Sequence, residues 1–246
     1  MNARLNTEVL IVGTGISGLL SAIELSKTYS VTMLTKSRTN KCSTSWAQGG
    51  IAAAMDNNDI NAHVNDTIIN GHEICDPESV TKIIKQGKKS INLLIKHGVN
   101  FNTDGTKLRQ TLEGGHSKRR IAYHNDNTGE EIHTSLLEKA KKNKKIIIKE
   151  DIMAIDLIGR KETHCDGLYA YDESNESVIT IKANIIILAT GGANKLYQYT
   201  TNPDTSTGDG IALAWRFGCT ISNMEFMQFH PTCLYHTNDK SFLISE

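Results

Sequence analysis

The sequence predicts an α/β fold of the doubly wound type, and three observations predict it. An apolar strand pattern, a glycine-rich turn and an amphipathic helix follow one another at the start of the chain. A second strand pattern comes directly after that helix, and a further fully apolar strand pattern runs into glycines near residue 190. Strands that alternate with helices in this way are typical of a mainly parallel sheet with helical crossovers.

The first elements form a strand, turn, helix and strand in succession. Residues 8–12 are a short run rich in β-branched apolar side chains, as in a strand covered on both faces. Gly13-Thr14-Gly15-Ile16-Ser17-Gly18 follows, then an amphipathic helix to about residue 28 and a second strand over 30–35. This succession is the context that a dinucleotide-binding fingerprint requires.

Each glycine of this motif has a physical task. Gly13 allows a tight turn, Gly15 lets the backbone approach a pyrophosphate, and Gly18 lets the helix pack against the strand. The N-terminus of the helix would face the phosphates with its N–H groups and the positive end of its dipole. We therefore predict that residues 13–18 bind the phosphates of a dinucleotide cofactor.

The end of the second strand departs from the usual pattern. An acidic residue normally binds the ribose hydroxyls there, whereas this chain has Thr35-Lys36-Ser37-Arg38. A lysine or a serine must then take that role. On spacing alone, Lys36 and Arg38 leave open a 2′-phosphate and hence NADP, although the segment that follows argues against it.

The remaining elements alternate in the same manner. Residues 102–126 lack periodicity and are predicted to be a long, functional loop. Helices are predicted over 77–97, 128–142 and 208–217, and strands over 146–149, 151–158, 167–172, 177–182 and 184–189. The expected architecture is one doubly wound domain with a small β insertion.

Composition limits the partners. Lys+Arg and Asp+Glu are balanced at 27 each, so we expect neither nucleic acid nor an acidic membrane as a partner. The 5 cysteines are odd in number and form no C-x-x-C pair, which predicts neither disulfides nor a metal site. The first residues lack the apolar segment of a signal peptide. We therefore expect a soluble, cytoplasmic protein.

Several motifs resemble a known superfamily. Cys42-Ser43-Thr44-Ser45-Trp46-Ala47-Gln48-Gly49-Gly50-Ile51 resembles the segment that cradles the flavin ring in the fumarate reductase and succinate dehydrogenase flavoproteins. The resemblance continues, in the order of the superfamily, at 189–193, 200–203, 208–210 and 228–232. It implies a Rossmann-type FAD-binding domain over 1–240, incomplete at its C-terminal side, and the start of a capping domain, otherwise missing, at 241–246.

Within this superfamily the chain resembles the L-aspartate oxidase family. Its loop from Glu113 to Arg120 is similar to the loop of the oxidases, whereas the respiratory enzymes carry no acid at position 113. Residues 197–203 match the oxidases almost letter for letter. Succinate dehydrogenase would have a histidine, covalently bonded to FAD, at position 43, and this chain has Ser43. The resemblance therefore implies FAD that is bound non-covalently.

The resemblance also assigns roles to single residues. Glu113 would pair with the amino group of the substrate, and His230 would hold a substrate carboxylate. Ser245 stands where the family usually has a substrate-binding threonine. Contacts with FAD would come from Thr14, Gly15, Ile16, Ser17, Lys36, Ser43, Thr44, Ser45, Trp46, Ala47, Gln48, Gly49, Gly50 and Asp209.

The implied reaction is the FAD-dependent oxidation of L-aspartate to iminoaspartate, which begins NAD synthesis. Electrons would pass to oxygen or fumarate, and a functional link to quinolinate synthase follows. The family's catalytic arginine would lie beyond Glu246, so we expect no turnover from this chain alone. Two alternatives stay open. One is a fumarate reductase-type flavoprotein, against which Glu113 and Ser43 count; the other is a catalytically inactive remnant.

Overall fold

The computed structural model describes residues 4–72, 74–160, 163–230, 232–235 and 241–244. Contacts divide the chain into two compact units. The first unit combines Met1–Trp46 with Leu136–Glu246, and the second is Ala47–Ser135. The boundary crosses helix α5 (Thr128–Lys141), which was predicted over 128–142. The described helices include none with the length and apolar character that crossing a bilayer requires.

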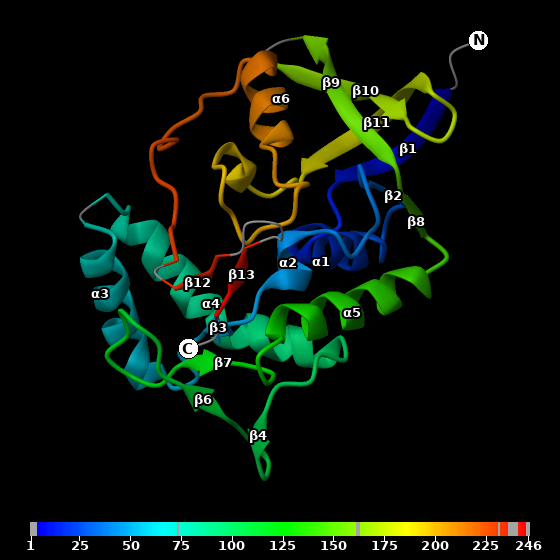
Figure 1. The fold of residues 1–246 in the computed structure, drawn as a ribbon. Helices are drawn as coiled ribbons and strands as arrows, with labels where there is room; N and C mark the ends of the chain where they lie inside the picture. The colour runs from blue at the N-terminus through cyan, green and yellow to red at the C-terminus, as the bar shows by residue number, and fades with distance from the viewer. Residues whose placement is uncertain (1–3, 73, 161–162, 231, 236–240, 245–246) are drawn as a thin grey trace. The chain divides into compact units, whose positions relative to one another are not determined.

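A six-stranded sheet in the order β8-β2-β1-β11-β10-β9 forms the first unit (Figure 1). Strands β8, β2, β1 and β11 run parallel, while β10 is antiparallel to both β11 and β9. The helix α1 (Ile16–Leu25) connects β1 to β2, which confirms the predicted α/β fold. The strands are β1 (Arg4–Val12), β2 (Val31–Leu34), β8 (Ile146–Lys149), β9 (Ile152–Arg160), β10 (His164–Asp172) and β11 (Ser177–Leu188).

Strand β11 differs from the prediction. The sequence predicted two strands, over 177–182 and 184–189, and the structure has one strand of 12 residues. It pairs with β1 from Thr180, opposite Arg4, to Leu188, and its first half also pairs with β10. Pairing with β1 continues past Lys182 and Asn184 to Ile185, so the backbone hydrogen bonds of the sheet keep these residues in one strand. The predicted β insertion therefore extends the parallel sheet.

Both faces of β1 are covered, as its uniformly apolar sequence predicted. A Cβ built at Gly18 of α1 would lie 3.5 Å from Cγ2 of Ile11, so Ile11 is on the α1 face. Leu10 and Val12 alternate with it and join a buried cluster that includes Leu213. Leu213 belongs to α6 (Asp209–Phe217), which packs against β9 (Figure 1). This packing fixes the carboxyl end of β1, where the glycine turn begins.

The second unit is mainly helical. Helix α3 (Ile60–Asn70) packs against α4 (Pro77–Lys96), which agrees with the helix predicted over 77–97. Asp76 caps α4 by accepting a hydrogen bond from the backbone N of Ser79 at 2.9 Å. Gly98 follows the helix at a φ of +99°, the left-handed conformation in which helices commonly end.

The long loop predicted over 102–126 contains paired strands that the sequence did not indicate. Strands β4 (Thr103–Asp104) and β5 (Lys107–Leu108) pair with each other, and β7 (Ile121–Ala122) pairs with both β3 (Ile51–Ala52) and β6 (Gln110–Thr111). Each has 2 residues, too few to show a period of two. The remaining short elements are α2 (Ser43–Trp46), η1 (Asn57–Asp59), η2 (Asn194–Leu196), β12 (Cys233–Leu234) and β13 (Phe242–Leu243).

Candidate functional site

The glycine turn after β1 leaves no space for a Cβ at two of its positions, Gly13 and Gly18. Gly13 has a φ of +114°, and a Cβ there would lie 2.2 Å from the carbonyl oxygen of Ala189. A Cβ at Gly18 would lie 2.1 Å from the carbonyl oxygen of Gly13. Both distances are far below a van der Waals contact, so only glycine fits either position. The turn therefore presents backbone to its surroundings.

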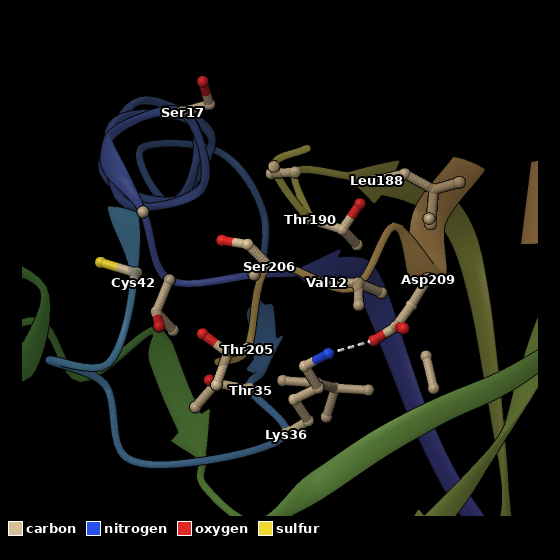
Figure 2. A pocket seen from close by; sticks show the side chains of 18 of the residues that line it. Val12, Ser17, Thr35, Lys36, Cys42, Leu188, Thr190, Thr205, Ser206 and Asp209 are labelled. Carbon is tan, nitrogen blue, oxygen red and sulfur yellow. Dashed lines mark hydrogen bonds and ion pairs between the residues drawn. The ribbon is translucent and has the colours of Figure 1, made fainter. Parts of the chain in front are cut away.

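A cavity of about 630 Å³ adjoins this turn (Figure 2). Its volume is in the range of small-molecule sites. The first turn of α1 lines it, and the first N–H groups of a helix have no partner within the helix. One of them, on Ile16, donates to Oγ1 of Thr44 at 3.0 Å. The predicted cofactor-binding residues that line the cavity are Gly13, Thr14, Gly15, Ile16, Ser17, Lys36, Ser43, Thr44 and Asp209.

Lys36 is paired inside this cavity (Figure 2). Its Nζ donates to Oδ2 of Asp209 at 2.5 Å and also to the hydroxyl of Thr207. The Thr207 hydroxyl donates in turn to Oδ1 of Asp209 at 2.6 Å. Arg38, the other cation at this strand end, pairs with Glu150 at 3.0 Å. Because both cations are neutralised by carboxylates, the arrangement does not favour the 2′-phosphate of NADP.

Hydroxyl groups join separate parts of the cavity wall, and the sequence interpretation missed those on residues 205–207. The hydroxyls of Ser43 and Ser206 lie 3.0 Å apart, and the hydroxyl of Thr205 donates to the carbonyl oxygen of Lys41 at 2.7 Å. The signal was present, because three successive hydroxyl residues precede α6 and such residues favour helix starts. Ser43, predicted to contact FAD, is thus tied to the segment that leads into α6.

The other predicted cofactor-binding residues do not line this cavity. Gly18 packs against the turn itself. In α2, the hydroxyl of Ser45 donates to the carbonyl oxygen of Cys42 at 2.9 Å, and Trp46 is 43% exposed. Ala47, Gln48, Gly49 and Gly50 belong to the second unit. There a Cβ at position 50 would lie 2.3 Å from the carbonyl oxygen of Ala122, so this position also requires glycine.

Glu113 lies in the second unit, between β6 and β7. Its side chain is exposed, and its Oε1 lies 3.5 Å from the position that a Cβ would take at Gly49. The carbonyl oxygen of Glu113 accepts a hydrogen bond from the backbone N of His116 at 3.3 Å, which closes a turn. The carboxylate therefore lies beside the segment that the resemblance assigned to the flavin ring.

A buried arginine anchors the far end of the Glu113 loop. Arg120 is 0% exposed; its Nε and Nη2 donate to the two carboxylate oxygens of Asp59 at 2.9 and 2.8 Å, and its Nη1 donates to Asp66 at 2.5 Å. Asp66 also accepts from the backbone N of Ser117 at 2.8 Å and from its hydroxyl at 2.7 Å. The bonds from Arg120 hold the pKa of both carboxyls below the usual range. The sequence interpretation missed this network.

His230 lines a smaller cavity, of about 290 Å³, in the first unit. The walls come from the segments 197–202 and 227–230, so two of the motifs that carried the resemblance meet at one place. The rings of Tyr197 and Phe229 pack edge to face across it, with centroids 4.9 Å apart.

The imidazole of His230 is oriented by its own loop. Its Nδ1 lies 3.0 Å from the carbonyl oxygen of Thr232 and 3.2 Å from the backbone N of the same residue. Ser241 also lines the cavity. Ser245, the third predicted substrate-binding residue, lies outside the described residues.

Known proteins resemble this chain over nearly its whole length. Residues 8–246 match the family model described as FAD binding domain. The chain is 47% identical over 248 residues to an L-aspartate oxidase of Acinetobacter baylyi, covering 97% of this chain and 46% of that protein. It is also 47% identical over 251 residues to L-aspartate oxidase 1 of Ralstonia nicotianae, covering 98% and 47%.

A solved structure of a related flavoprotein also resembles this chain. A mutant of the E. coli quinol fumarate reductase FrdA resembles the chain with a TM-score of 0.91 at 26% identity, over 99% of this chain and 42% of that one. The matches confirm the resemblance predicted from the motifs. The chain spans about half the length of the curated relatives that it matches.

Proposed function

Because this chain belongs to the FAD binding domain family, we propose that it forms the flavin-binding part of an L-aspartate oxidase. The observation that carries this proposal is the Glu113 carboxylate beside Gly49, an acid placed next to the segment expected at the flavin ring. Similarity to L-aspartate oxidases over 97% of the chain supports it. We further propose that residues 1–240 belong to the FAD-binding domain and that 241–246 begin the capping domain.

The cavity in the first unit suits the ADP part of FAD. Gly13 and Gly15 would let the backbone approach the pyrophosphate, and α1 would offer its first N–H groups and dipole to the negative charge. The Lys36–Asp209 pair would hydrogen-bond the ribose hydroxyls, because it offers a donor and an acceptor side by side. Ser43 cannot form a histidyl link, so acid precipitation should release the flavin. Flavin retained in the pellet would contradict non-covalent binding.

Bound flavin would supply the hydride acceptor that amino-acid side chains lack. The protein's own groups would orient the substrate: Glu113 would accept hydrogen bonds from its ammonium group. His230 would hydrogen-bond a substrate carboxylate through its imidazole, and Ser245 would add a hydroxyl. Loss of a hydride and a proton converts L-aspartate to iminoaspartate, the precursor that quinolinate synthase would use for NAD. Oxygen or fumarate would accept the electrons.

A fumarate reductase-type activity is the second candidate, because a quinol fumarate reductase shares the fold with a TM-score of 0.91. Fumarate and succinate have no ammonium group, so an acid at position 113 would have no partner on them. The two candidates therefore differ in what Glu113 contributes.

The deciding experiment replaces Glu113 by glutamine in the full-length protein. We expect the KM for L-aspartate to rise roughly tenfold or more, the loss of one charged hydrogen bond, while fumarate reduction changes less than about twofold. Glu78→Gln, at an exposed position in α4, is the matched control. Equal losses on both substrates would refute the role of Glu113 and favour the fumarate reductase candidate.

A further inference from the structure

One face of helix α3 carries a row of polar side chains. Asp59, just before the helix, and His63, Asp66 and Asn70 within it are spaced by four, three and four residues. Residues at these intervals lie one above another on a helix. We call these residues the α3 polar stripe.

Every member of the α3 polar stripe contacts the Glu113 loop. The two aspartates bind Arg120 and Ser117. The Nδ2 of Asn70 donates to the carbonyl oxygen of Gly115 at 2.9 Å. The ring of His63 packs edge-on against the ring of His116, with centroids 5.5 Å apart. The loop is therefore attached to α3 at four of its residues, starting two residues after Glu113.

The charges at this contact are balanced without Glu113. The Nη1 of Arg120 lies 3.0 Å from Nδ1 of His116, and because a guanidinium only donates, that nitrogen is the acceptor. Burial, followed by the charge of Arg120, lowers the pKa of His63. Arg120 and Lys118, whose Nζ lies 3.7 Å from Asp59, thus face the two carboxylates of the α3 polar stripe, and the Glu113 carboxylate is not drawn into the cluster.

We propose that the α3 polar stripe is a positioning device for Glu113, with Asp66 and Asn70 as positioning residues. The inference deepens the proposed function, since it requires that Glu113 binds the ammonium group of the substrate. A loop with two adjacent glycines, at 114 and 115, would otherwise be ordered only when the substrate arrives, and that ordering would reduce affinity. Attachment to α3 removes this cost beforehand. Selection of amino dicarboxylates over unsubstituted ones would then depend on α3.

The test uses Asn70→Ala and Asp66→Asn in the full-length protein, with Asn65→Ala as the control. Asn65 is an exposed residue of the same helix outside the α3 polar stripe. We expect kcat/KM for L-aspartate to fall roughly fivefold or more in both stripe variants, about one hydrogen bond each. Fumarate reduction should change less than about twofold, and Asn65→Ala should leave both activities unchanged.

The outcomes separate the two proposals. A selective loss on L-aspartate in Glu113→Gln and in the stripe variants supports both. If Glu113→Gln shows that loss and Asn70→Ala behaves like Asn65→Ala, the positioning role is overturned while the proposed function stands. Should Glu113→Gln itself lose both activities equally, the proposed function fails and the positioning role fails with it. Asn70 is exposed, so its variant should fold even if Asp66→Asn does not.

Discussion

The glycine turn and the Glu113 loop hold their backbones in opposite ways. The turn is fixed by exclusion, since any Cβ at positions 13 or 18 would overlap a carbonyl oxygen. The loop is fixed by attraction, through hydrogen bonds to Asp59, Asp66 and Asn70. A steric overlap prevents the turn conformation altogether, whereas the loop should loosen in proportion to the number of hydrogen bonds that are removed. Variants of the glycine turn should therefore fail abruptly and variants of the Glu113 loop by degrees.

The largest effect is expected for Gly13→Ala. The new methyl would lie 2.2 Å from the carbonyl oxygen of Ala189 at a φ of +114°, so we expect a cost above about 3 kcal/mol and no detectable FAD binding. Urea unfolding and titration of FAD fluorescence would measure this. Gly87→Ala is the control: its methyl would meet Ala53 at 3.4 Å, an ordinary contact, and should stabilise α4 by up to about 1 kcal/mol. If Gly13→Ala kept an FAD affinity within tenfold of the original, position 13 would not require glycine, and the contrast between the turn and the loop would be wrong.

A smaller but still large effect is expected for Arg120→Met. The change removes the guanidinium that binds both Asp59 and Asp66, whose side chains are 12% and 13% exposed. Breaking a buried pair of this kind costs about 3–5 kcal/mol, which urea unfolding would detect. Lys118→Met is the control, because Lys118 is 53% exposed and lies 3.7 Å from Asp59, so it should cost less than about 1 kcal/mol. Equal costs would show that the buried network does not hold the loop.

Asp209→Asn should have an intermediate effect, confined to the cavity of the first unit. It removes the charge that Lys36 contacts at 2.5 Å, and we expect the Kd for FAD to rise roughly tenfold, as for a lost charged hydrogen bond. Asp204→Asn serves for comparison, because its pair with Lys195 lies on the surface, with the Asp204 side chain 70% exposed. An equal change of the Kd for FAD in both variants would show that the Lys36–Asp209 ion pair does not contribute to cofactor binding.

The smallest effect concerns pH. The hydrogen bond from Arg120 lowers the folded-state pKa of Asp66, whereas an unfolded aspartate has a pKa of about 3.9. The stabilisation is therefore complete above that unfolded value and is lost as the pH falls through the folded-state pKa. The difference in unfolding free energy between the original protein and Asp66→Asn should be constant above about pH 5 and shrink as the pH falls from about 4 towards 2. A difference that is independent of pH would contradict the assigned ion pair.

Local patterns predicted much of the fold. The glycine turn, α4, α5 and α6 were predicted with bounds close to those observed, because each is encoded by neighbouring residues. Strand β11 was predicted as two strands, since its continuity comes from pairing with β1. The contacts of Arg120 reach 54 and 61 residues along the chain, and no local pattern specifies them.

In the candidate sites, too, single residues could be predicted from the sequence, whereas contacts between distant residues could not. Lys36 and Asp209 were each assigned to FAD by resemblance, but their ion pair joins residues 173 positions apart and was not foreseen. The spacing of the α3 polar stripe was visible in the sequence. Its meaning was not, because polar residues on a helix are usually solvated. Only the position of the Glu113 loop distinguishes this stripe from an ordinary exposed face.

Pairing between the start and the end of the first unit also sets an order of events during synthesis. The strand, turn and helix that open the chain leave the ribosome long before Ala189, against which Gly13 packs, and before Asp209, which pairs with Lys36. Contacts of such long sequence separation form slowly. A nascent chain that stops before α6 has the fingerprint glycines but lacks the opposite wall of the cavity. We therefore expect this protein to bind its cofactor late in its synthesis, although the glycine turn is translated early.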